Sequence, residues 1–100
     1  MHYCKDLKEV RVNIDRIDRD IVKLIAERGQ FVEQAAIFKN DEAVIREPQR
    51  IKVVINNVRT LAAEFGVDPD IVESVYRTMI DAFIDFELKE YRKIIEDEIK

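Results

Sequence analysis

The chain has little of what disulfides, sharp turns and histidine chemistry require. Its 100 residues include two Gly, two Pro, one Cys, one His and no Trp. So few glycines and prolines, together with 38% charged residues, favour a helical protein over a sheet-rich one. The single cysteine, Cys4, excludes an intrachain disulfide and gives no sign of an oxidising compartment.

Several kinds of active site are also missing from the sequence. The one histidine is His2, so neither a histidine-based triad nor a metal cluster is expected. There is no glycine-rich phosphate loop and no cysteine spacing for zinc, and the one serine, Ser74, has no evident base. We therefore expect no metal and no cofactor.

The charge and the hydropathy limit the partners. A formal net charge of −4 argues against nucleic-acid binding, which usually needs a basic face. The first residues lack the apolar core of a signal peptide, and no apolar stretch is long enough to span a membrane. These features predict a soluble cytoplasmic protein that binds neither nucleic acid nor a membrane.

The apolar pattern predicts an all-α fold in a single domain over residues 1–100. Three helices are expected, at residues 6–39, 48–65 and 69–97. A turn-like segment, residues 40–46, separates the first two. Pro48 suits the first position of the second helix and Gly66 its end, and Asp68 before a proline suits the start of the third.

The first helix is too long for the globule that one chain can form. At about 33 residues it would measure roughly 50 Å. A compact domain of this size has a radius of gyration of only about 13 Å. A second copy would cover the overhanging apolar positions, which predicts an intertwined homodimeric helix bundle. A helical arm that docks onto a different protein is the alternative.

One arginine interrupts the heptad of the first helix. The apolar positions, spaced by three and four residues, are Leu7, Val10, Ile14, Ile17, Ile21, Leu24, Phe31, Ala35 and Phe38. Arg28 occupies the place of the next apolar residue. Because a guanidinium keeps its proton, Arg28 needs an anionic partner or water. It is either a polar core residue that sets the register or the floor of an anion-binding pocket.

Helix geometry places two further cations relative to Arg28. Lys39 follows it by three turns plus roughly 20°, so both point off one face about 16 Å apart and could grip a ligand roughly 10 Å long. The alternative for Lys39 is a solvated lysine at the helix end. Arg11 is about 25 Å from Arg28 along the axis and roughly 100° around it. We expect Arg11 either to complete the pocket of a partner subunit or to pair at the surface with Asp15.

A carboxylate and another arginine adjoin apolar positions of the later helices. Glu87 follows Ile80 and Phe83 by seven and four residues, so it extends the inward stripe of the third helix. Apolar surroundings disfavour a charged carboxylate, so Glu87 is expected to be partly protonated and able to donate a hydrogen bond. Arg50 flanks the apolar start of the second helix. These two residues are either rim residues or the halves of an Arg50–Glu87 salt bridge.

These cations and the buried-looking carboxyl, without a nucleophile, suit a reaction that needs only positioning and electrostatics. The residues resemble the small all-helical chorismate mutase family. The resemblance rests on Arg11-x-x-Ile14-Asp15-x-Ile17-Asp18, Ala26-Glu27-Arg28, Phe38-Lys39 and Pro48-x-Arg50, and it spans roughly residues 4–95. It implies an intertwined dimer of three-helix protomers with two identical pockets, each completed by an arginine from the partner's first helix.

The resemblance also implies a substrate and roles. The family's substrate is chorismate, a cyclohexadiene dicarboxylate that rearranges to prephenate without covalent catalysis. Arg28 and Arg11 of the partner subunit would clamp its two carboxylates. Lys39 and Glu87 would donate hydrogen bonds to the ether oxygen, where negative charge develops as the C–O bond breaks. The other expected substrate-binding residues are Glu47, Arg50, Ile51, Ile80, Phe83 and Ile84.

One position departs from the mutase pattern. Typical mutases have a glutamate directly after the arginine, whereas this chain has Ile51, which is similar to isochorismate-pyruvate lyases of salicylate pathways. Glu47 is expected to supply the missing polar contact, and Glu87 stands where these lyases carry a glutamine. Chorismate mutase is therefore the first hypothesis. Isochorismate-pyruvate lyase in the same pocket is the alternative, and a non-catalytic helical interaction module is the third.

Overall fold

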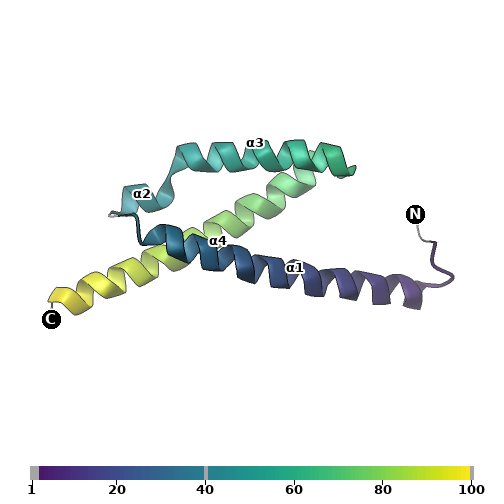
Figure 1. The fold of residues 1–100 in the computed structure, drawn as a ribbon, viewed down its shortest axis with the longest axis horizontal. Helices are drawn as coiled ribbons and strands as arrows, with labels where there is room; N and C mark the ends of the chain where they lie inside the picture. Colours follow the sequence, from purple (N-terminus) through teal and green to yellow (C-terminus); the bar gives the residue numbers. More distant parts are fainter. Residues whose placement is uncertain (1–2, 40, 100) are drawn as a thin grey trace. The chain divides into compact units, whose positions relative to one another are not determined.

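The computed structural model describes residues 3–39 and 41–99, and every regular element in them is a helix. The helices are α1 (Leu7–Ala36), α2 (Glu42–Arg46), α3 (Pro48–Phe65) and α4 (Pro69–Ile99), as Figure 1 shows. The predicted all-α fold with three long helices is confirmed. His2 and Asn40, on which two sequence expectations rest, lie outside the described residues.

The chain divides into two units, Met1–Gln34 and Ala35–Lys100. The first unit consists mainly of α1, and the second contains α2, α3 and α4. The single domain over residues 1–100 stays a prediction. Among the residues described, none of the helices combines the length and apolarity needed to cross a membrane.

The first turn of α1 is capped by side chains. Asp6 Oδ1 accepts a hydrogen bond of 2.8 Å from the backbone N–H of Glu9. In return, Glu9 Oε2 accepts one of 3.3 Å from the backbone N–H of Lys5. Such contacts satisfy donors that the start of a helix leaves without intrahelical partners. They explain why the helix begins at Leu7, as the sequence predicts within one residue.

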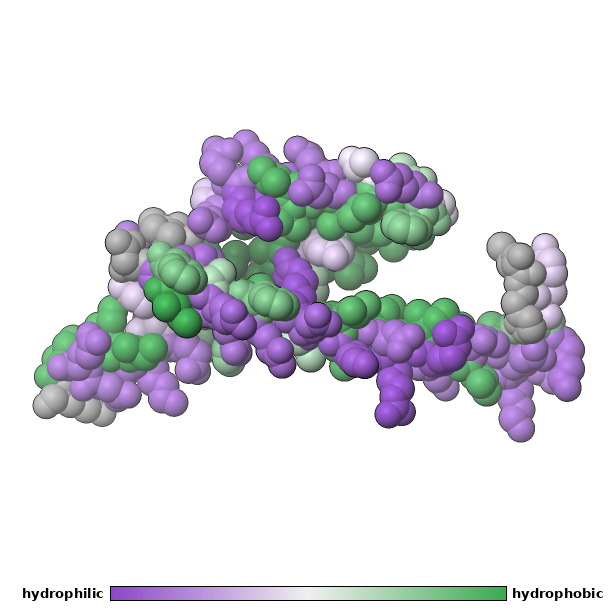
Figure 2. Space-filling view, in the orientation of Figure 1, coloured by the Kyte–Doolittle hydropathy of each residue, from purple (hydrophilic) through white to green (hydrophobic). Residues whose placement is uncertain are grey.

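The apolar stripe of α1 stays largely exposed in the single chain. Its members are between 38% and 63% exposed: Leu7, Val10, Ile14, Ile17, Ile21, Leu24 and Phe31. Figure 2 shows hydrophobic side chains along one edge of α1 and mainly hydrophilic side chains along the opposite edge. A stripe of this kind is the packing face of an amphipathic helix, and such helices draw most of their stability from packing.

The helix α1 ends at Ala36, three residues before its predicted end. The backbone N–H groups of Phe38 and Lys39 donate to the carbonyls of Ala35 and Ala36, at 3.0 and 3.1 Å. Hydrogen bonds to the third residue back tighten the chain and stop the α-helix. Lys39 therefore lies outside α1. The prediction that Arg28 and Lys39 share a face of one helix is wrong, because the helical rotation does not continue to Lys39.

The segment predicted as a turn contains the short helix α2. Ile45 is its buried residue, with 5% of its surface exposed, and α2 packs on α4. Five residues are too few to show a helical period in the sequence, which is why the pattern did not reveal this helix. After α2, Glu47 has a left-handed backbone (φ 30°, ψ 68°), and Pro48 begins α3 as predicted.

The second unit is built on the packing of α3 against α4. Its buried apolar residues are Ile45, Ile55, Val58, Ala62, Ile80 and Leu88. Gly66 ends α3 with φ 77°, and its N–H bonds to the last turn of the helix. Asp68 Oδ1 accepts a hydrogen bond of 2.9 Å from the backbone N–H of Asp70 at the start of α4. Both predicted boundaries are confirmed, because local backbone chemistry sets them.

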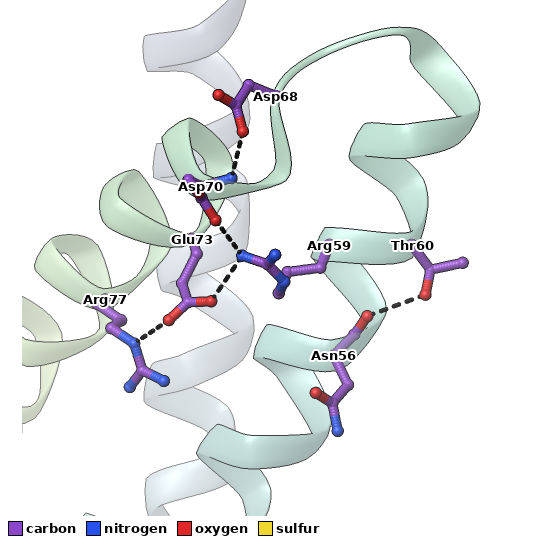
Figure 3. A network of polar contacts seen from close by, with 7 residues as sticks. All are labelled: Asn56, Arg59, Thr60, Asp68, Asp70, Glu73 and Arg77. Atoms are coloured by element: carbon purple, nitrogen blue, oxygen red, sulfur yellow. Dashed lines mark hydrogen bonds and ion pairs between the residues drawn. The ribbon is translucent and has the colours of Figure 1, made fainter.

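A charged network joins α3 to α4 near this turn (Figure 3). Arg59 Nη1 donates to Asp70 Oδ1 and Glu73 Oε1, both at 2.9 Å, and Arg77 Nε donates to Glu73 Oε2 at 2.7 Å. The hydrogen bond from Arg77, with that from Arg59, holds the pKa of Glu73 below its ordinary value of 4.5. The network therefore links the two helices on their solvent side.

Candidate active site

Glu87 is the buried charged residue of the part of the chain that the structure describes, with 8% of its surface exposed. It lies on α4 two turns after Ile80 and directly before Leu88, both of which are also buried. Within residues 3–39 and 41–99, its Oε2 has no hydrogen-bond partner. A buried carboxyl oxygen in this state is unfavourable unless a proton or a ligand satisfies it. The predicted inward position of Glu87 is confirmed.

Lys39 brings its ammonium group to this carboxyl. Its Nζ lies 3.5 Å from Glu87 Oε2, and the two side chains are 15% and 6% exposed. A charge-assisted hydrogen bond would measure about 2.7–2.9 Å, so the contact is an ion pair that leaves the donors of Lys39 available. Arg50 lies in the first turn of α3 and is exposed. The alternative of an Arg50–Glu87 salt bridge is therefore wrong, since Glu87 pairs with Lys39.

Glu47 joins the same cluster from the junction between α2 and α3. Its Oε2 lies 3.9 Å from Lys39 Nζ. A positive φ is uncommon for a residue with a Cβ, and the following Pro48 disfavours the right-handed helical conformation at Glu47. Three charged groups thus converge from the segment before α2, the segment after it, and α4. A sequence pattern could not show this convergence.

Apolar side chains continue the site along α4 and into α3. Ile80 is buried, and Phe83, Ile84 and Ile51 are half-buried. On α4 these residues and Glu87 recur at spacings of three and four, so they share one face of the helix. Their contact with a substrate stays a prediction.

The two arginines of α1 that are predicted to bind substrate, Arg11 and Arg28, belong to the other unit of the chain. Arg28 is half-buried and Arg11 is exposed. Among the described residues, Arg11 forms no ion pair with Asp15, so this surface alternative is not supported. That Arg11 and Arg28 act in one pocket with Lys39 and Glu87 stays a prediction.

The cluster can bind an oxygen-rich ligand. A half-buried ammonium beside a buried carboxyl offers one donor outright and a second donor whenever the carboxyl is protonated. In the described ranges, no three His, Cys, Asp or Glu side chains are grouped so that they could hold a metal ion. The ammonium and the carboxyl group themselves support hydrogen bonding and charge stabilisation.

Sequence reasoning missed two features near the cluster. Leu88, 3% exposed, is a core residue that did not stand out in the apolar pattern. Arg92 Nε donates a hydrogen bond of 2.8 Å to Glu42 Oε1 and ties α4 to α2. Glu42 and Arg92 are 50 positions apart in the chain, and no local spacing rule relates them.

Comparison with known proteins identifies the family. Residues 10–88 match the family model described as chorismate mutase type II. The match covers most of the chain and extends over both of its units. The chain belongs to the chorismate mutase type II family. The predicted resemblance is confirmed, and with it the prediction of a chorismate mutase-type enzyme.

Three relatives show the range within this family. The chain is 34% identical over 90 residues to the isochorismate pyruvate lyase of Pseudomonas aeruginosa, covering 90% of this chain and 89% of the relative. It is 37% identical over 76 residues to the chorismate mutase of Methanocaldococcus jannaschii, covering 75% and 77%. It is 32% identical over 89 residues to the bifunctional chorismate mutase/prephenate dehydratase of Aquifex aeolicus, covering 85% of this chain and 25% of the relative.

Proposed function

We propose that this chain catalyses the pericyclic rearrangement of chorismate to prephenate, with Lys39 and Glu87 at the reacting ether oxygen. The observation that carries the proposal is the Lys39 ammonium 3.5 Å from a buried carboxyl oxygen of Glu87 that lacks a hydrogen-bond partner within the described residues. Two donors that meet one oxygen stabilise charge as it develops in the transition state.

The proposed mechanism needs neither a nucleophile nor a proton transfer. One C–O bond breaks while a new bond forms within the same molecule, so the protein has to hold the compact conformer and stabilise the oxygen. Arg28 and Arg11 of the partner subunit are proposed to hold the two carboxylates, because guanidinium groups match carboxylates with two parallel hydrogen bonds. Arg50 and Glu47 are proposed to contact the polar edge of the ring.

A homodimer is part of the proposal. The exposed apolar stripe of α1 supports it. A second copy of the chain carries the same stripe, so the two stripes would cover each other in a symmetric dimer. The partners are therefore a small dicarboxylate and a second copy of the chain. Cytoplasmic location stays a prediction from the sequence.

The direct test is consumption of chorismate by the purified protein, followed by absorbance. Lys39→Ala should lower kcat by on the order of 10²–10³-fold, because it removes a donor to the developing charge. Lys52→Ala, which changes an exposed lysine of α3, is the matched control and should keep the wild-type rate. A folded dimer that consumes no chorismate would overturn the proposal.

A second substrate has specific support. Ile51 stands where the resemblance expects a glutamate in mutases, and the lyase of Pseudomonas aeruginosa matches 90% of the chain. Isochorismate should therefore be tested in parallel, with pyruvate release as the readout. We expect Ile51→Glu to raise the ratio of chorismate to isochorismate turnover. A wild-type protein that releases pyruvate faster than it forms prephenate would make lyase activity the main function.

A further inference from the structure

The chain segment that carries Lys39 is tied to α4 at two points. The first is the ion pair of Lys39 with Glu87. The second lies three residues further along the segment, where Glu42 accepts a hydrogen bond of 2.8 Å from Arg92 Nε. Glu87 and Arg92 are five residues apart on α4. One helix thus contacts both the catalytic lysine and the start of the short helix that follows it.

The short helix α2 links the charged groups of the site. Lys39 precedes this helix and Glu47 follows it. The two residues form an ion pair with Lys39 Nζ 3.9 Å from Glu47 Oε2. A helix of five residues is not stable by itself, so tertiary contacts must hold it in place. Ile45 supplies an apolar contact, and the Glu42–Arg92 pair supplies a directional one.

We propose that the Glu42–Arg92 pair is a latch that positions Lys39 for the rearrangement, an inference that rests on the proposed function. Arg92 acts through α2 and is a positioning residue. The hydrogen bond from Arg92 holds the pKa of Glu42 below its ordinary value of 4.5, so Glu42 is a carboxylate at neutral pH. The charge that the latch needs is therefore present under assay conditions.

The size of the effect follows from the exposure of the pair. Arg92 and Glu42 have side chains that are 56% and 43% exposed, so their attraction is weakened by solvent. Exposed ion pairs shift equilibria only modestly, and we expect kcat to fall about two- to fivefold when the pair is broken. The KM for chorismate should stay unchanged, because the arginines proposed to hold the carboxylates are not altered.

The first experiment compares three variants of α4 at neutral pH. Arg92→Gln should lower kcat with unchanged KM, and Arg92→Lys should recover part of the loss because it keeps the charge. Lys93→Gln removes the same charge from the neighbouring exposed position and should match the wild-type protein. Melting temperatures measured by circular dichroism should agree among all variants, which separates misplacement of Lys39 from unfolding.

The second experiment tests whether Glu42 and Arg92 act as a pair. The double variant Glu42→Gln with Arg92→Gln should lose no more activity than either single variant, because the interaction is lost once. Glu42→Gln should also speed cleavage by trypsin after Lys39 and Arg46, since α2 opens more often.

Several results would overturn the latch. These are a wild-type kcat in Arg92→Gln, an equal loss in Lys93→Gln, a loss confined to KM, or additive losses in the double variant. An unchanged trypsin cleavage rate in Glu42→Gln overturns it as well, and this readout does not depend on catalysis. A wild-type protein that does not consume chorismate overturns the proposed function instead.

Discussion

At the scale of single residues, the contact between Lys39 and Glu87 defines the candidate site. Glu87 is buried because α4 places it on the same face as Ile80 and beside Leu88. Lys39 reaches it from a segment without regular structure. A carboxyl group donates a hydrogen bond only while it is protonated, whereas an amide donates at any pH. This difference gives a direct test of the role of Glu87.

We expect Glu87→Gln to keep a substantial part of the wild-type kcat and Glu87→Ala to lower kcat by on the order of 10²-fold, because an amide still donates a hydrogen bond to the ether oxygen and a methyl group does not. The measurement is the kcat of the three proteins at saturating chorismate. Equal losses in the two variants, or a wild-type kcat in Glu87→Ala, would contradict this role.

Glu47 shows how the backbone brings a side chain to the site. Its positive φ is a conformation that glycine adopts readily and that costs a residue with a Cβ free energy. The turn leads from α2 into α3 and brings the Glu47 carboxylate within 3.9 Å of Lys39. The carboxylate of Glu47 therefore contributes a favourable contact with Lys39, whereas its left-handed backbone conformation costs folding free energy.

The backbone cost can be measured by comparing Glu47→Gly with Glu47→Ala. Both variants remove the carboxylate, but only alanine keeps the Cβ, so Glu47→Gly should have a free energy of unfolding about 1 kcal/mol higher. Urea unfolding curves would provide the values. Equal stability of the two variants would show that the left-handed conformation is not retained. Both should have a lower kcat/KM than the wild-type protein if Glu47 contacts the substrate.

At the scale of elements, the hairpin of α3 and α4 is held by two kinds of contact. An apolar core runs between the helices, and the Arg59–Glu73–Arg77 network lies on their solvent side. The arginines lower the pKa of Glu73, which means that the folded state favours its charged form. The contribution of Glu73 to stability is therefore complete above pH 4.5 and is lost as the pH falls through its lowered pKa.

We predict that the melting temperature falls below pH 4.5 in the wild-type protein and falls less steeply in Glu73→Gln, which cannot titrate at this position. Circular dichroism melts between neutral and acid pH would measure the slopes. Glu64→Gln, at an exposed position of α3, is the matched control and should keep the wild-type slope. Parallel slopes for the wild-type protein and Glu73→Gln would contradict the predicted role of the network.

At the scale of the whole molecule, the exposed apolar positions are the feature that one chain does not explain. The stripe of α1 is one group. On α3, Leu61 and Phe65 are 47% and 80% exposed, although they follow the buried Val58 by three and seven residues and so share its face of the helix. A second copy of the chain would bury these exposed apolar side chains. If α1 extends across the partner, Arg11 and Arg28 of one pocket come from different chains.

Subunit mixing tests this arrangement. Arg11→Ala and Arg28→Ala homodimers should each be nearly inactive, because each pocket lacks one arginine. Unfolding and refolding an equimolar mixture should restore about a quarter of the wild-type activity, since half of the dimers are mixed and each has one complete pocket. No recovery, with mixed dimers shown by mass spectrometry, would place both arginines of a pocket on one chain.

The extent to which the sequence anticipates this protein depends on the range of each interaction. Pro48, Gly66 and Asp68 set helix ends through their own backbone and neighbouring N–H groups, so the boundaries at 48, 65 and 69 were predictable. The spacing from Ile80 to Glu87 likewise showed that Glu87 faces inward. The family followed from short motifs for the same reason, because they lie within single segments.

The sequence by itself therefore determined the all-α class, the long helices, the family and the inward position of Glu87. The structure corrected the end of α1, which local hydrogen bonds place before Lys39. Only the tertiary structure decided that Glu87 pairs with Lys39 and not with Arg50, and that Arg92 bonds to Glu42 of α2. The physical reason is that these contacts join residues far apart in the chain. Their geometry depends on how α2, α3 and α4 pack, and a periodic pattern reports only which face of a helix is apolar.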